Sequence, residues 1–180
     1  MKRIRPEILF LLIAVFLFGC ATGGSKKSNV TSSEEGRYYE TAGKYSIYPP
    51  ESWQMMDFPG LKYKVVVGPS RNDFAPNVNF ADEAFDGPLD VYVNAVIEGL
   101  KKMIVDVEII ERTGFTTLKN EKGEKLTTLT TQQGQHFFQV FYIFPGDGIY
   151  MVAAGTVRAE FGEEYSGTFD RILETFEWTK

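Results

Sequence analysis

Short segments in which hydrophobic and polar residues alternate predict a β-rich domain over residues 37–180. In the segment 105–113, Val105, Val107 and Ile109 fall on one face of the predicted strand, and charged residues separate them. Further strands are predicted at 44–48, 63–67, 77–84, 124–132, 135–144 and 149–157. Turns containing glycine at 121–123, 133–134 and 145–148 separate the last four strands, so we expect an antiparallel meander.

Two segments carry hydrophobic residues at spacings of three and four, which predicts helices with one buried face. The first begins at Pro88, a favourable first residue of a helix, and its apolar stripe runs from Leu89 to Ile104. The second begins near 161–163, and its stripe consists of Tyr165, Phe169, Ile172, Leu173 and Phe176. Together the elements predict an α+β fold, in which an antiparallel β-sheet meander packs with two main helices.

Aromatic residues are concentrated in the predicted strand at 137–144. Because side chains alternate along a strand, its even-numbered and odd-numbered aromatic residues must face opposite sides. The interpretation that we favour is a central strand covered on both faces by the two helices. The alternative is a ligand or partner surface in a groove between sheet and helix, formed by Trp53, Tyr92, Phe137 and Phe141.

An unbroken hydrophobic run at residues 8–18 follows a basic segment at residues 2–5. These 11 residues are too few for a membrane-spanning helix, which needs about 20, but they suit a signal peptide. The run ends in Leu-Phe-Gly-Cys at 17–20, and the segment resembles a bacterial lipoprotein signal with its lipobox. The resemblance implies cleavage between Gly19 and Cys20 and acylation of Cys20, for example by palmitate. A plain secretory signal in which the cysteine has no role is the alternative.

The sequence after the signal is divided into a linker and a domain. Residues 20–36 lack aromatic side chains and are rich in small and polar residues, so we expect a flexible linker that begins at the lipidated cysteine. The expected organisation is a signal peptide at 1–19, the linker at 20–36 and one α+β domain at 37–180. The 180-residue chain carries a net charge of −5, which argues against a nucleic-acid partner.

Residues suited to catalysis or metal binding are few, because the chain contains one cysteine and one histidine. His136 is a conceivable general base or metal ligand, but a structural imidazole at the rim of the sheet is the favoured interpretation. Asp82, Glu83 and Asp86 are conceivable calcium ligands, yet their spacing does not match an EF-hand, and a solvated acidic loop is favoured. We therefore predict no enzymatic activity, no cofactor and no metal site.

The order of the elements resembles that of a known family. An aromatic strand leads through Pro49 and Pro50 to Trp53, and an Asn-Val-Asn-Phe strand follows at 77–80. A helix, a long meander and a C-terminal helix ending near Phe176 complete the order. This looks like the PsbP-like fold, which is shared by extrinsic proteins of photosystem II and by bacterial lipoproteins of the DcrB type. The resemblance implies a non-catalytic accessory or binding role in the cell envelope.

These observations favour a membrane-anchored cell-envelope lipoprotein that binds or scaffolds another envelope protein through its PsbP-like domain. The membrane is its second expected partner, through the N-terminal lipid. Since alanine rather than aspartate follows Cys20, resemblance to the enterobacterial sorting signal favours the outer membrane in a bacterium with two membranes. The alternative function is a periplasmic carrier that holds a small apolar ligand in a cleft between sheet and helix. A hydrolase without a recognisable motif is a third candidate.

Overall fold

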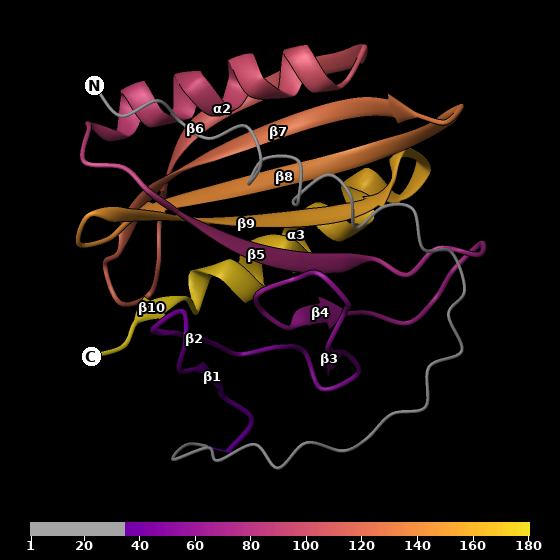
Figure 1. Ribbon diagram of the computed structural model, residues 1–180. Helices are drawn as coiled ribbons and strands as arrows, with labels where there is room; N and C mark the ends of the chain where they lie inside the picture. Colours follow the sequence, from indigo (N-terminus) through magenta and orange to yellow (C-terminus); the bar gives the residue numbers. More distant parts are fainter. Residues whose placement is uncertain (1–34) are drawn as a thin grey trace.

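The structure is a computed structural model that describes residues 35–180 (Figure 1). The predictions for the signal peptide, for Cys20 and for most of the linker fall on residues 1–34 and lie outside the described residues. The described strands form two sheets. The larger sheet contains β3 (Gln54–Met56), β4 (Val65–Val67), β5 (Asn77–Ala84), β6 (Asp106–Thr116), β7 (Lys122–Gln132), β8 (Gln135–Pro145) and β9 (Ile149–Arg158).

Strands of the larger sheet follow the order β3-β4-β5-β9-β8-β7-β6, and all neighbours are antiparallel. The predicted meander is therefore confirmed for β6 to β9, and β5 pairs with the last of these strands. The smaller sheet has the order β1-β2-β10 and joins β1 (Tyr38–Glu40), β2 (Tyr45–Ile47) and β10 (Glu177–Trp178). It joins strands from the start and the end of the described chain, with β2 between β1 and β10.

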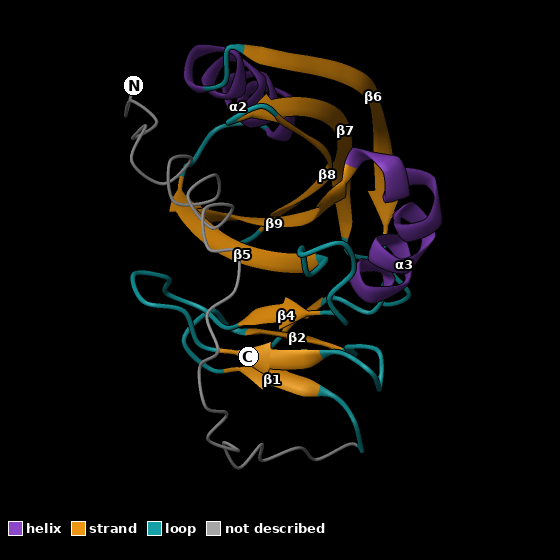
Figure 2. Cartoon of the chain, turned by 90° about the vertical axis from the view of Figure 1, so that its right-hand side faces the viewer, coloured by secondary structure: helices purple, strands orange, loops and turns teal. Residues whose placement is uncertain are grey.

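Two α-helices cover the larger sheet in the described part of the chain, one on each face (Figure 2). Helix α2 (Leu89–Met103) lies against the concave side of the curved sheet. Helix α3 (Gly162–Glu174) lies on the outer side and follows the 3₁₀ turn η2 (Ala159–Phe161). Pro88 is the N-cap of α2 rather than its first residue, and its carbonyl accepts a hydrogen bond from the Tyr92 amide.

Two hydrophobic cores flank the sheet, and β8 contributes to both. Val140, Tyr142 and Phe144 of β8 belong to the core under α3. Phe141 and Ile143 belong to the core under α2. The favoured prediction of a central strand that is covered on both faces is thus confirmed, as is the α+β class.

Two sequence predictions about local structure were wrong. Val105 is 97% exposed, because β6 begins one residue later and Val105 belongs to the connection from α2. The predicted turn at 121–123 lies earlier, at 117–121, where the Thr117 hydroxyl accepts hydrogen bonds from the amides of Lys119 and Glu121. Gly123 lies inside β7, where a Cβ atom would come within 2.3 Å of the Ile143 carbonyl oxygen. Close approach between strands, rather than a turn, therefore requires this glycine.

The predicted acidic loop is wrong for Asp82 and Glu83, which belong to β5, whereas Asp86 is exposed in the connection between β5 and α2. Alternation along the strand turns the carboxylates of Asp82 and Glu83 to opposite faces. Asp82 accepts hydrogen bonds from the Lys62 ammonium at 2.8 Å, and buried Glu83 accepts one from the Tyr92 hydroxyl at 3.1 Å. Both carboxylates therefore have hydrogen-bond partners within the protein, and neither needs a calcium ion as a partner.

Candidate functional site

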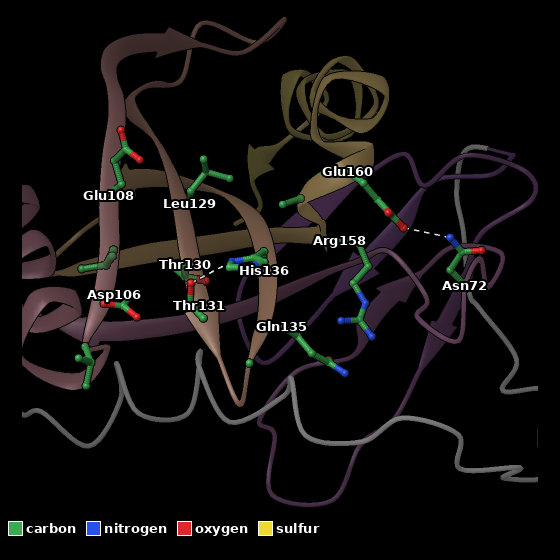
Figure 3. Close-up of a pocket in the computed structure, with 14 residues that line it drawn as sticks. Asn72, Asp106, Glu108, Leu129, Thr130, Thr131, Gln135, His136, Arg158 and Glu160 are labelled. Atoms are coloured by element: carbon green, nitrogen blue, oxygen red, sulfur yellow. Dashed lines mark hydrogen bonds between the residues drawn. The ribbon is translucent and has the colours of Figure 1, made fainter.

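A pocket of about 950 Å³ lies at the end of the larger sheet where β6 and β8 begin (Figure 3). Its lining comes from the first residues of β6 and β8, the last residues of β7 and β9, the turn η2 and Asn72. We call it the sheet-end pocket. Its volume falls in the range of about 300–1,000 Å³ that is typical of small-molecule sites.

The two-residue turn between β7 and β8 shapes one wall of the sheet-end pocket. Gln133 and Gly134 have φ angles of 51° and 74°, the left-handed conformation that a tight hairpin turn requires. The turn places Thr131 directly opposite His136, whose Nδ1 lies 3.0 Å from the threonine Oγ1. His136 is exposed at the rim of the sheet, the position that the sequence favoured. Its hydrogen-bond partner is a hydroxyl rather than the carboxylate that orients a general base in a catalytic triad.

Charged groups contribute much of the remaining lining of the sheet-end pocket, namely Asp106, Glu108, Arg158 and Glu160. Glu160 accepts a hydrogen bond at 3.0 Å from the Asn72 amide. The Arg158 guanidinium lies 5.2 Å from the centroid of the Phe137 ring and 5.6 Å from that of the Phe74 ring. Within residues 35–180, no group of three or more His, Cys, Asp or Glu residues is arranged to hold a metal ion. Hydrogen bonding and ion pairing are the interactions that the lining groups offer to a ligand.

The four aromatic residues that the sequence proposed as one surface are distributed over the molecule. Tyr92 and Phe141 are buried in the core under α2, with exposed fractions of 2% and 0%. Trp53 packs on the opposite core, with its ring centroid 6.3 Å from that of Phe169. Phe137 is buried beside the sheet-end pocket, opposite Thr130 on β7 and Arg158 on β9. The structure therefore brings only Tyr92 and Phe141 into one cluster.

The ring and the hydroxyl of Tyr92 are both occupied by contacts within the core under α2. Its ring stacks on Tyr150, with the centroids 4.3 Å apart, and its hydroxyl donates to Glu83. Burial, together with the charge of Glu83, raises the pKa of Tyr92 well above the ordinary tyrosine value. These contacts assign Tyr92 to the packing of α2 on the sheet.

Sequence reasoning did not find the sheet-end pocket. Its walls come from four strands and a turn that are far apart in the sequence, and the residues involved form no motif. The local signal was the tight turn at 133–134, which fixed where β7 and β8 meet but not what lies beside them.

Comparisons with known proteins place this architecture among solved structures. No family model matches the sequence, and no curated protein matches it. The structure is similar to that of LpqN from Mycobacterium tuberculosis, which is described as involved in cell envelope biogenesis. The TM-score is 0.58 at 12% identity, over 82% of this chain and 87% of LpqN.

Cyanobacterial PsbP from Synechocystis sp. PCC 6803 is also similar, with a TM-score of 0.56 at 14% identity over 87% of this chain and 98% of that protein. A Pseudomonas aeruginosa protein of unknown function gives a TM-score of 0.54 at 13% identity, over 77% of this chain and 93% of that one. The chain therefore has the PsbP-like fold that the order of its elements indicated. Among residues 35–180, no helix is both long enough and apolar enough to cross a membrane.

Proposed function

We propose that this protein is a lipid-anchored component of the bacterial cell envelope whose PsbP-like domain binds another envelope component without catalysis. The sheet-end pocket is the binding site in this proposal, and the observation that carries it is the pocket's size and mixed lining. Cys20 is the anchoring residue, and the domain faces the periplasm or the exterior. The outer membrane is favoured over the inner membrane if the cell has both.

Two observations support the envelope location. The chain carries a short hydrophobic run that ends at its single cysteine, in the arrangement of a lipoprotein signal. LpqN, which has the same fold, is described as taking part in cell envelope biogenesis. More than one acyl chain on Cys20 would give stable membrane attachment, because a single chain binds only marginally.

The lining of the sheet-end pocket favours a polar over an apolar partner. Asp106, Glu108, Arg158 and Glu160 border it, and Thr130, Thr131 and His136 add hydrogen-bonding groups. The alternative of an apolar ligand between sheet and helix gains no support, since Tyr92 and Phe141 pack tightly in the core there. We therefore retain the binding role and assign it to the end of the sheet.

Metabolic labelling with palmitate tests the anchor. We expect label on the wild-type protein and none on Cys20→Ala, while Ser25→Ala in the same linker should keep the label. Label that persists on Cys20→Ala, or a wild-type protein that takes up none, would contradict the lipid anchor.

Site-specific photocrosslinking in intact cells tests the binding site. A photoreactive amino acid at Gln135, on the rim of the sheet-end pocket, is expected to capture a discrete envelope component. The matched control is Leu118, which is 73% exposed in the β6–β7 connection at the other end of these strands. Equal capture from both positions, or none from Gln135, would contradict the proposal.

A further inference from the structure

The register of the larger sheet aligns four polar residues in one continuous row. Asn77 on β5 lies opposite Thr156 on β9, Thr156 opposite Gln139 on β8, and Gln139 opposite Thr128 on β7. Directly opposed residues in antiparallel strands project to the same face of a sheet. We call these four residues the polar row.

The polar row faces the concave side of the sheet, under α2. Two residues further along the strands, the same face carries Ala154, Phe141 and Leu126, which belong to the core under α2. Asn79 lies opposite Ala154 and shares this face. The polar side chains therefore border a hydrophobic core instead of solvent.

These side chains are buried, yet much of their hydrogen-bonding capacity has no protein partner. Asn79, Thr128, Gln139 and Thr156 are at most 1% exposed, and Asn77 is 8% exposed. Six of their side-chain atoms form no hydrogen bond with the described residues: Asn77 Oδ1, Asn79 Oδ1 and Nδ2, Thr128 Oγ1, Gln139 Nε2 and Thr156 Oγ1. Buried polar atoms are nearly always paired, because an unpaired one loses its hydration without compensation. Six on one face indicate a site that is built to receive polar groups.

The sheet-end pocket lies next to the polar row. The row of residues next outward along the same face is Val107, Thr130, Phe137 and Arg158. Val107, Thr130 and Arg158 line the sheet-end pocket. The Thr130 hydroxyl also donates a hydrogen bond at 2.9 Å to Gln139 Oε1, so one side chain touches both the pocket and the polar row.

The chemistry of the polar row selects the kind of ligand. All of its members and Asn79 are neutral, and their unpaired atoms include amide donors, amide acceptors and hydroxyls that serve as either. Hydroxyl groups match this mixture, because each also donates and accepts. Since the unpaired atoms of the row carry no charge, they match a neutral polar molecule, which needs no counter-charge when it is buried.

We propose that the sheet-end pocket and the polar row behind it form a binding site for a small neutral molecule that bears several hydroxyl groups. This inference deepens the proposed binding function, because it names the ligand class of the same pocket. It does not depend on the lipid anchor, which palmitate labelling tests separately.

The test is a titration of the full-length, isotope-labelled protein in a zwitterionic detergent with myo-inositol, a rigid neutral polyol. We expect chemical-shift changes in the side-chain amide signals of Gln139 and Asn79, and nuclear Overhauser effects between these amides and the C–H protons of the polyol. Effects to water alone would show that the polar row holds only internal water, and that result would overturn the proposal.

A double variant provides the specific control. Thr128→Val with Thr156→Val removes two hydroxyls while keeping β-branched side chains of similar shape, and we expect about tenfold weaker myo-inositol binding or its complete loss. Thr127→Val on the same strand changes a residue that faces the α3 side, so binding should be retained. Undiminished binding by the double variant would overturn the assignment. The wild-type Overhauser effects decide the question even if the double variant does not fold.

Discussion

Nη1 of Arg37 lies 3.2 Å from Oε1 of Glu177, an ion pair that joins the start of the domain to its last strand. The same guanidinium donates to the Ser46 hydroxyl at 2.8 Å and to the Thr175 carbonyl at 3.3 Å. Its carbon lies 4.3 Å from the centroid of the Tyr48 ring, and Arg37 is only 5% exposed. Arg37 therefore links the residues that follow the linker to β2 and β10 of the smaller sheet.

Arg37→Met should destabilise the protein by about 2–3 kcal/mol, because it removes an ion pair and two hydrogen bonds of a buried guanidinium. Among the described residues, the Glu177 carboxylate then keeps only the Ser46 hydroxyl and the more distant Lys119 as partners. Urea denaturation of the full-length protein measures the free energy of unfolding. Lys101→Met is the matched control, since the Lys101–Glu98 pair is exposed and 3.9 Å apart, and it should change stability by less than about 0.5 kcal/mol. Equal effects of the two substitutions would show that the Arg37 contacts contribute no more than a surface pair.

Gly155→Ala tests the close packing of α3 on the sheet. A Cβ atom at this position in β9 would come within 2.7 Å of the Phe169 ring, so we expect a loss of roughly 1–3 kcal/mol in the free energy of unfolding. Gly114→Ala is the control, because nothing lies within 4 Å of its added Cβ atom on the edge strand β6. It should be neutral or slightly stabilising. A neutral Gly155→Ala would mean that α3 can move away from β9 at little energetic cost.

Local patterns predicted the long elements well because those patterns are set by burial. Phe141 and Tyr142 of β8 point to opposite faces of the sheet, so both faces had to be buried. The two segments with helical stripes were the elements available to bury them. Strands β1, β3 and β10 were missed because two or three residues are too few to show a period. They form by pairing across the chain, which no local window reveals. Strands β2 and β4 are as short, but Pro49-Pro50 and Gly68-Pro69 marked their ends in the sequence.

The candidate site was harder to predict than the fold, and Gln139 shows why. In the sequence it is one glutamine between Phe138 and Val140, in an aromatic strand. Gln139 belongs to a polar row only because Thr128 on β7 and Thr156 on β9 lie opposite it. This pairing is set by the register of the strands. A shift of one residue would turn each of these side chains to the other face. The polar row is therefore a property of the assembled sheet.

Tyr142→Phe probes a polar link between α3 and β8. The Tyr142 hydroxyl donates to Asp170 Oδ1 at 2.7 Å, and the Lys125 ammonium bonds the same carboxylate. We expect a loss of about 1–2 kcal/mol, at the lower end for a hydrogen bond to a charged group because Lys125 remains. Tyr165→Phe on the same helix should change the free energy of unfolding by less than about 0.5 kcal/mol, since no hydrogen bond is formed by its hydroxyl within the described residues. Equal losses would contradict the link.

Alkaline pH should unfold the domain through its buried tyrosines. Burial is the main cause that raises the pKa of Tyr45, Tyr92 and Tyr142 well above the ordinary value of about 10. The folded state therefore keeps phenolic protons that the unfolded chain loses. Below about pH 10 both states are protonated and stability is unaffected, whereas above it stability falls by up to about 1.4 kcal/mol per pH unit for each group.

We expect tyrosinate absorbance from these three residues to appear in one step with the loss of circular dichroism above about pH 10. Tyr142→Phe should reduce the amplitude of that step by the contribution of one tyrosine. Gradual ionisation of all the tyrosines near their ordinary pKa, with the circular dichroism unchanged, would contradict the prediction. Such a result would mean that solvent reaches these hydroxyls in the folded state, and that both cores are more open than their packing indicates.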